Sequence, residues 1–241
     1  MEKKKLTSFI DKYHLAGNTE SVKVECKDNT LNCNFIASDQ NVVGKVSMNG
    51  FNVKDCELGI YATSQLVKLL TALDSNVEIA VNSTGGTTYS INLSDTNKTE
   101  CIFMLADMSV IQQVPQMKQL PDFNVKIKLT SDFTEKFVKS KNALPDAENF
   151  AVREDALGTE IILNYSSLNT NRITFDVSSE STADNELSPI CFSANLFKEI
   201  LLANKDATEG YLEVSQAGLA RVTFIGPDYL SNYFLVQLQS A

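Results

Sequence analysis

Very few side chains in this chain of 241 residues could perform acid–base or nucleophilic chemistry. Its one histidine, His14, would have to serve any Ser–His–Asp or Cys–His site, yet no Gly-x-Ser-x-Gly turn accompanies it. A lone histidine at the end of a predicted helix is more often a surface or capping residue than a catalytic one. The acid pair Glu154 and Asp155 falls in a predicted loop, where carboxylates are usually solvated. These residues predict that the protein is not an enzyme.

The five cysteines could in principle ligate a metal, but their spacing argues against it. They contain no Cys-x-x-Cys pair, and no histidine or acidic cluster has ligand spacing, so we expect no metal and no cofactor. An odd number of cysteines in apolar or alternating stretches predicts reduced, partly buried thiols. They are Cys26, Cys33, Cys56, Cys101 and Cys191. Because no export signal or membrane-length apolar run is visible, we expect a cytoplasmic protein.

The chemistry that the charges do favour is attraction of a polyanion. The net charge is −9, but four segments that read as helices, 1–14, 63–74, 130–144 and 193–206, carry +3 against −12 for the rest. Basic helices on an acidic body are consistent with a local surface for a polyanion, although lysines are common on any solvated helix. The helix lysines are Lys3, Lys4, Lys5, Lys12, Lys68, Lys136, Lys139, Lys141, Lys198 and Lys205.

Helices and strands that position these lysines are predicted from periodicity. Apolar residues recur at helical spacing in each helix, as Leu6, Phe9 and Ile10 do in the first. The expected N-caps of the later helices are Thr63 or Ser64, Thr130 or Ser131, and Ser193. Strands are predicted at 22–26, 31–35, 42–46, 77–81, 88–93, 100–105, 149–153, 159–165, 172–177, 186–192, 211–215, 220–225 and 229–238. The order predicts an α+β fold with antiparallel sheets.

Two stretches of sequence recur in step, which predicts an internal duplication. Residues 9–12 resemble residues 133–136, and residues 60–68 resemble residues 190–198. A repeat of this length fits two similar domains, each with two helices packed on antiparallel sheet. We expect an N-terminal domain at 1–106, a connector at 107–124 and a C-terminal domain at 125–241. The connector has two prolines and several apolar residues, so we expect it to lie against the body or to bind something.

This plan, with lysines on the helices and an acidic body, resembles the DNA polymerase sliding clamps. The sequence is most similar to the two-domain, trimer-forming clamps of T4-type bacteriophages. Residues 56–61, leading into 65–70 and then 74–81, are similar to the matching stretch of those phage clamps, and so is the closing strand 231–236. The resemblance covers nearly the whole chain in pattern, although clamp sequences have no invariant signature.

The resemblance implies a homotrimeric ring whose helices surround duplex DNA, so that a tethered DNA polymerase cannot diffuse away. The ten helix lysines would then face DNA and attract phosphates regardless of base sequence. The resemblance also implies that the polymerase and an ATP-driven clamp loader dock through short hydrophobic peptides beside the connector. The matching positions are Ile111, Val114, Met117, Leu120, Pro227 and Tyr229, which could equally well seal the junction between the domains.

Two other classes of function stay open at this stage. A duplicated β-rich structural or adhesion protein of a virion would explain the strands and turns, but it gives no reason for four helices that carry lysines. An enzyme with a site between the domains would need a catalytic constellation that the sequence does not offer. No membrane partner is expected.

Overall fold

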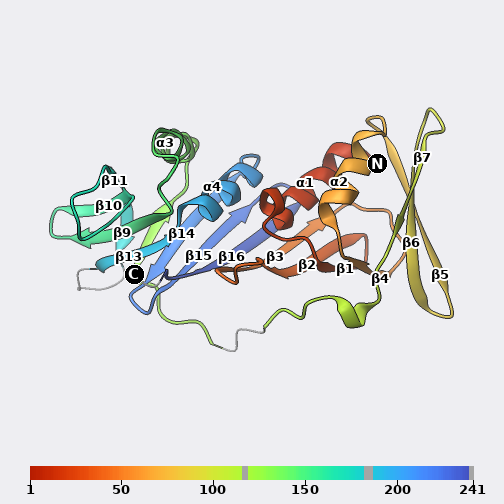
Figure 1. Cartoon of the computed structure of the whole chain (residues 1–241), viewed down its shortest axis with the longest axis horizontal. Helices are drawn as coiled ribbons and strands as arrows, with labels where there is room; N and C mark the ends of the chain where they lie inside the picture. The colour runs from red at the N-terminus through yellow and green to blue at the C-terminus, as the bar shows by residue number, and fades with distance from the viewer. Residues whose placement is uncertain (116–118, 182–186, 239–241) are drawn as a thin grey trace. The chain divides into compact units, whose positions relative to one another are not determined.

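The computed structural model describes residues 1–115, 119–181 and 187–238 (Figure 1). Contacts within the chain divide it into two compact units. The first comprises residues 1–38, 44–115 and 228–231, and the rest of the described chain forms the second. Each unit is α+β, with two helices and antiparallel sheet, so the fold class predicted from the sequence is confirmed.

The first unit contains helices α1 and α2 and most of seven strands. Its elements are α1 (Lys3–His14), β1 (Val22–Lys27), β2 (Thr30–Ile36), β3 (Val42–Asn49), β4 (Cys56–Ile60), α2 (Thr63–Thr71), β5 (Val77–Thr84), β6 (Thr87–Asp95) and β7 (Glu100–Met104). Short 3-10 turns follow at Leu15–Gly17 and Met108–Val110. Strands β3, β2, β1 and β4 are neighbours in that order, and β5, β6 and β7 form a separate sheet.

The second unit repeats this strand order. Its elements are β8 (Val125–Lys128), α3 (Ser131–Ala143), β9 (Asn149–Asp155), β10 (Gly158–Leu163), β11 (Ile173–Val177), β12 (Ser179–Ser181), β13 (Leu187–Ser193), α4 (Ala194–Ala203), β14 (Glu209–Ser215), β15 (Leu219–Ile225) and β16 (Tyr229–Val236). The order β11, β10, β9, β13 matches β3, β2, β1, β4, and β14, β15, β16 match β5, β6, β7. The duplication inferred from two short sequence matches is therefore a duplication of topology.

Strand β8 beside β14 is the main addition in the second unit. Its counterpart in the first unit is reduced to a single bridge between Glu2 and Asn76, with the N–H of Val77 donating to the carbonyl of Met1 at 2.9 Å. Strands β4, β8 and β12 were not predicted from the sequence. All three are five residues or shorter, too short to show a clear period of two.

The cores of the two units are rich in aromatic residues. In the first unit, the ring of Phe9 on α1 contacts those of Tyr13 and Phe51 edge-on, at centroid distances of 5.6 and 6.0 Å. In the second, the ring of Phe197 on α4 contacts Phe137 at 4.8 Å and Phe150 at 4.7 Å. Such ring contacts stabilise beyond the area they bury.

Helices α1 and α2 contact each other within the first unit, and α3 and α4 do so within the second. The hydroxyl of Thr130 accepts from Phe133 N–H at 3.1 Å, and that of Ser193 accepts from Leu196 N–H at 3.3 Å. These two predicted N-caps are confirmed. None of the helices formed by described residues combines the length and the apolar character needed to cross a membrane.

Candidate nucleic-acid interface

Five of the ten lysines predicted to face DNA have exposed side chains. They are Lys4 on α1, Lys68 on α2, Lys136 and Lys139 on α3, and Lys205 just after α4. The Lys139 ammonium donates to Glu135 at 3.2 Å, one turn earlier, and the Lys136 ammonium lies 4.8 Å from the centre of the Phe175 ring. Exposed pairs of this kind are weak, so these lysines can exchange their partners for phosphates at little cost.

Three more of the predicted lysines are partly buried and already engaged. Lys3 donates to the carbonyl of Leu73, Lys5 forms an ion pair with Asp228, and Lys198 lies 3.9 Å from Glu199. Lys3 and Lys5 therefore stabilise the first unit through contacts of their own. A phosphate would have to compete with those contacts.

The prediction is wrong for Lys12 and Lys141, which are 0% and 5% exposed. Lys12 donates to the hydroxyl of Ser8 at 2.9 Å, and its ammonium lies 4.1 Å from the centre of the Tyr229 ring. Lys141 donates to the carbonyl of Pro145 at 2.6 Å. Burial, with the nearby charge of Lys198, lowers the pKa of Lys141. Neither ammonium can reach a phosphate while these contacts persist.

His14 is buried and joins a polar network rather than a catalytic site. Its Nε2 lies 3.2 Å from Glu20 Oε1 and 3.1 Å from Ser64 Oγ. In a hydrolase triad the serine and the acid bond opposite ring nitrogens, whereas here both use Nε2. No group of three or more potential metal ligands occurs among the described residues either. The network instead holds the start of α2.

Glu20 caps helix α2 in place of the predicted Thr63 or Ser64. Its side chain accepts from the Ser64 N–H at 2.9 Å and from the Ser64 hydroxyl, and its carbonyl accepts from Thr63 N–H at 3.1 Å. The helix itself begins after Ala62, which has no capping side chain. Sequence reasoning missed this cap because the capping carboxylate lies far from the helix in the chain.

Replacing Glu20 by alanine should lower the free energy of unfolding by about 1 kcal/mol, the usual value of a lost cap. We expect no more because the side chain is 40% exposed and solvent screens its charge. Glu20→Gln, which keeps an acceptor, should lose less. Urea unfolding followed by circular dichroism measures both changes.

The stabilisation by Glu20 should also depend on pH. Partial burial opposes ionisation of this carboxyl, but the hydrogen bonds from Ser64 and the contact with His14 outweigh it and lower the pKa of Glu20 below 4.5. A group whose pKa is depressed by folding stabilises the fold above its unfolded pKa, and the effect is lost as pH falls through the folded pKa. The difference between wild type and Glu20→Ala should therefore shrink below about pH 4.5. If the stability difference between wild type and Glu20→Ala stays constant down to about pH 3, which is roughly 1.5 pH units below the ordinary pKa of glutamate, this assignment is contradicted.

Residues 108–114, at the start of the connector, lie against the outer face of the first unit's sheet. Ile111 and Val114 line a cavity of about 390 Å³ together with side chains of β1 and β2. Those strand residues, Lys23, Glu25, Asn32 and Asn34, alternate with the buried residues of the same strands. The cavity is therefore on the side of the sheet away from α1. A mixed polar and apolar groove of this kind could hold a short peptide.

The structure does not bring all six predicted pocket residues to that cavity. Tyr229 is buried, with its ring beneath Lys12 of α1, so it points to the helix side of the sheet. Leu120 and Pro227 are exposed and belong to the second unit. Met117 lies outside the described residues. Only Ile111 and Val114 are shown to share a cavity.

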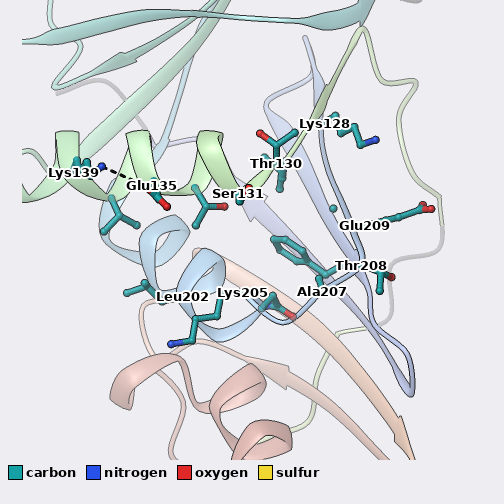
Figure 2. Close-up of a pocket in the computed structure, with 16 residues that line it drawn as sticks. Lys128, Thr130, Ser131, Glu135, Lys139, Leu202, Lys205, Ala207, Thr208 and Glu209 are labelled. Carbon is teal, nitrogen blue, oxygen red and sulfur yellow. Dashed lines mark hydrogen bonds and ion pairs between the residues drawn. The ribbon is translucent and has the colours of Figure 1, made fainter.

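A cavity of about 650 Å³ lies in the second unit between α3, the end of α4 and strand β14 (Figure 2). Leu202, Phe224 and Val138 give it an apolar lining. Two of the exposed lysines, Lys139 and Lys205, also line it. Contacts of these lysines with a polyanion would therefore lie beside apolar surface.

An exposed apolar surface on strand β7 was missed by the sequence reasoning. Ile102 and Met104 are 58% and 65% exposed, and with Tyr61 and Val110 they line a cavity of about 580 Å³. Strand β7 is an edge of its sheet, and β11 is an edge strand of the second unit. The signal was the unbroken apolar run at 101–105, since a strand with one solvated face should alternate. An exposed apolar edge of this kind is typical of a surface that contacts another chain.

The fold resembles that of a solved structure, the proliferating cellular nuclear antigen from Entamoeba histolytica. The two align with a TM-score of 0.73 and 13% sequence identity, over 99% of this chain and 97% of that one. No family model and no curated protein matches the sequence. At this identity the likeness shows the fold alone.

Proposed function

We propose that this chain is one subunit of a ring-shaped sliding clamp, which encircles duplex DNA and keeps a replicative DNA polymerase on its template. The observation that carries the proposal is the match in fold over the whole length of both chains. The sequence pattern, which resembles that of the sliding clamps, is consistent with the same role. This function needs no catalytic residue and no cofactor, because a closed ring holds its partner by topology.

Self-association would occur between edge strands. Strand β7 in the first unit and β11 in the second are edges of different sheets, so pairing β7 of one copy with β11 of the next joins copies head to tail. A head-to-tail contact closes into a ring when the rotation allows it. The exposed side chains of Ile102 and Met104 would then be covered. We propose three copies, as in the two-domain clamps that the sequence resembles.

The exposed lysines of the four helices would line the hole and attract phosphates. Lysine is a point charge on a flexible stem, so it gives attraction without fixed base contacts, as sliding requires. Polymerase and clamp loader would dock through short hydrophobic peptides, for which the cavity at Ile111 and Val114 is the proposed position. The protein would act where DNA is replicated, which for a phage protein is the cytoplasm of the host.

Two measurements test this function. Light scattering after size exclusion should give about three times the chain mass of 26.6 kDa. The protein should also remain on nicked circular DNA after loading and leave when that circle is cut. A monomer that binds circular and linear DNA equally would contradict the proposal. A large regular lattice without retention on circles would instead favour a structural protein of a virion.

A further inference from the structure

Two of the five cysteines face each other across a pair of strands. In the antiparallel register of β1 with β4, Cys26 lies directly opposite Cys56. Directly opposite residues of an antiparallel pair project to the same side of the sheet. Cys26 continues the buried set of β1, and Cys56 precedes the buried Leu58 of β4 in the same alternation.

The spacing of such a pair suits a disulfide. Directly opposite residues of antiparallel strands have Cα atoms about 4.5 or 5.5 Å apart, depending on the hydrogen-bonding pattern. Disulfides span Cα separations of about 4.4–6.8 Å. Both kinds of register position therefore fall within the Cα range of a disulfide.

The two sulfur atoms also influence each other chemically. Burial raises the pKa of Cys26, and the neighbouring Cys56 raises it further. Burial raises the pKa of Cys56 as well, while a hydrogen bond from Cys26 opposes that rise. Burial therefore disfavours both thiolates, and the hydrogen bond joins the two sulfur atoms directly.

Cys56 is more accessible to solvent than Cys26. Cys26 is buried and lines the interior beneath α1. Cys56 is half-buried, on strand β4 at the edge of its sheet, and lines a groove of about 500 Å³. A small oxidant can therefore reach Cys56 from solvent, whereas Cys26 is shielded from it.

No other cysteine has a thiol opposite it in the strand register. Cys33 faces Val24, Cys101 faces Leu93 and Cys191 faces Ala151. These three residues provide internal controls, and two of them, Cys101 and Cys191, are half-buried like Cys56.

We propose that Cys26 and Cys56 form a reversible cross-strand disulfide when the protein meets a hydroperoxide. The Cys56 thiolate attacks one peroxide oxygen and becomes a sulfenic acid, while the other oxygen leaves as hydroxide or alkoxide. The Cys26 sulfur then gives up its proton, attacks the sulfenic sulfur and releases water. Two thiols lose two electrons in total and the peroxide gains them. Because both thiols are weakly acidic, the reaction is slow and faster at alkaline pH.

The bond would close the chain segment between the two cysteines, which contains β2 and β3. A cross-link of this kind stabilises a fold chiefly by restricting the unfolded chain. It would also link β4 covalently to β1. Gly59 of the same strand β4 accepts a hydrogen bond from Ala106 N–H at 2.8 Å, just before the connector. Oxidation should therefore raise the melting temperature, by roughly 5 °C.

Peptide mapping of the oxidised full-length protein tests the proposal. The protein is treated with hydrogen peroxide at mildly alkaline pH, its remaining thiols are blocked with N-ethylmaleimide in denaturant, and it is cut with trypsin without reduction. Cleavage after lysine separates Cys26 on peptide 24–27, Cys33 on 28–45 and Cys56 on 55–68. We expect 24–27 joined to 55–68, lighter by two hydrogens and separated by dithiothreitol.

Variants provide the matched comparison. Cys56→Ser should abolish both the linked peptide and the rise in melting temperature on oxidation, whereas Cys191→Ser should keep both. Circular dichroism checks that each variant folds. If a variant does not fold, the peptide map of the wild-type protein still tests the proposal. The proposal is overturned if oxidised wild-type protein yields Cys26 and Cys56 only as maleimide adducts or as sulfinic acids. It is equally overturned if Cys56 is linked to another cysteine.

Discussion

A chain carrying Ile102→Asp and Met104→Asp should behave as a 26.6 kDa monomer, while the wild type has about three times that mass. Both side chains project from the edge strand β7 and are more than half exposed, so the folded chain alone gains little from them. In a joined edge they would be buried against the next copy. Burying an apolar side chain of this size contributes about 1.5–3 kcal/mol, whereas burying an unpaired carboxylate costs several.

The matched control is Leu157→Asp. Leu157 is 97% exposed in the turn between β9 and β10, so this change also replaces an apolar surface residue by an acid. It should leave the wild-type mass unchanged. Light scattering after size exclusion at several protein concentrations measures all three chains. If the β7 variant keeps the wild-type mass while Leu157→Asp does too, β7 is not the joining edge.

The second large effect is expected on binding to DNA. A variant with Lys4, Lys68, Lys136 and Lys205 all changed to alanine should bind a short duplex much more weakly and with a smaller dependence on salt. Each lost phosphate contact makes the slope of log affinity against log salt less steep by about 0.9. At about 0.1 M salt this corresponds to a loss of affinity of roughly eightfold. The four residues are exposed and sit on, or just after, all four helices, so the fold should tolerate the change.

Lys45→Ala is the matched control for this experiment. Lys45 is exposed on β3 and alternates with buried neighbours, so it lies on the sheet face away from the helices. Fluorescence anisotropy of a labelled duplex, titrated at several salt concentrations, gives the slopes. Lys45→Ala should match the wild type. Equal salt slopes for all three proteins would show that the helix lysines do not contact DNA, even if the ring itself forms.

Local sequence patterns were sufficient for much of the fold. The four helices follow from apolar residues at helical spacing, and most strands from alternation, because each pattern records which face of an element is buried. The caps at Thr130 and Ser193 were also predictable, since the capping hydroxyl lies three residues before the N–H that it accepts from. The cap by Glu20 was not, because it joins residues 44 positions apart.

The site was less predictable than the fold. A helical pattern shows that Lys12 lies off the most apolar stripe, but not that the Tyr229 ring from a distant strand covers it. Lys141 turns back to the carbonyl of Pro145 in the same way, while Lys136 on the same helix stays exposed. A long aliphatic stem lets lysine be buried or solvated at nearly any position on a helix. Whether its ammonium is buried depends on which other segments of the same chain pack over it.

The sequence by itself determined the α+β class, the repeated order of helices and strands, and the absence of any recognisable catalytic motif. These properties depend on residue types and on short-range periodicity, which are present in the chain before it folds. Tertiary structure alone decided which of the helix lysines are exposed, that β7 has an exposed apolar edge, and that Cys26 faces Cys56. Each of these depends on register and coverage between segments far apart in the chain, which no local pattern records.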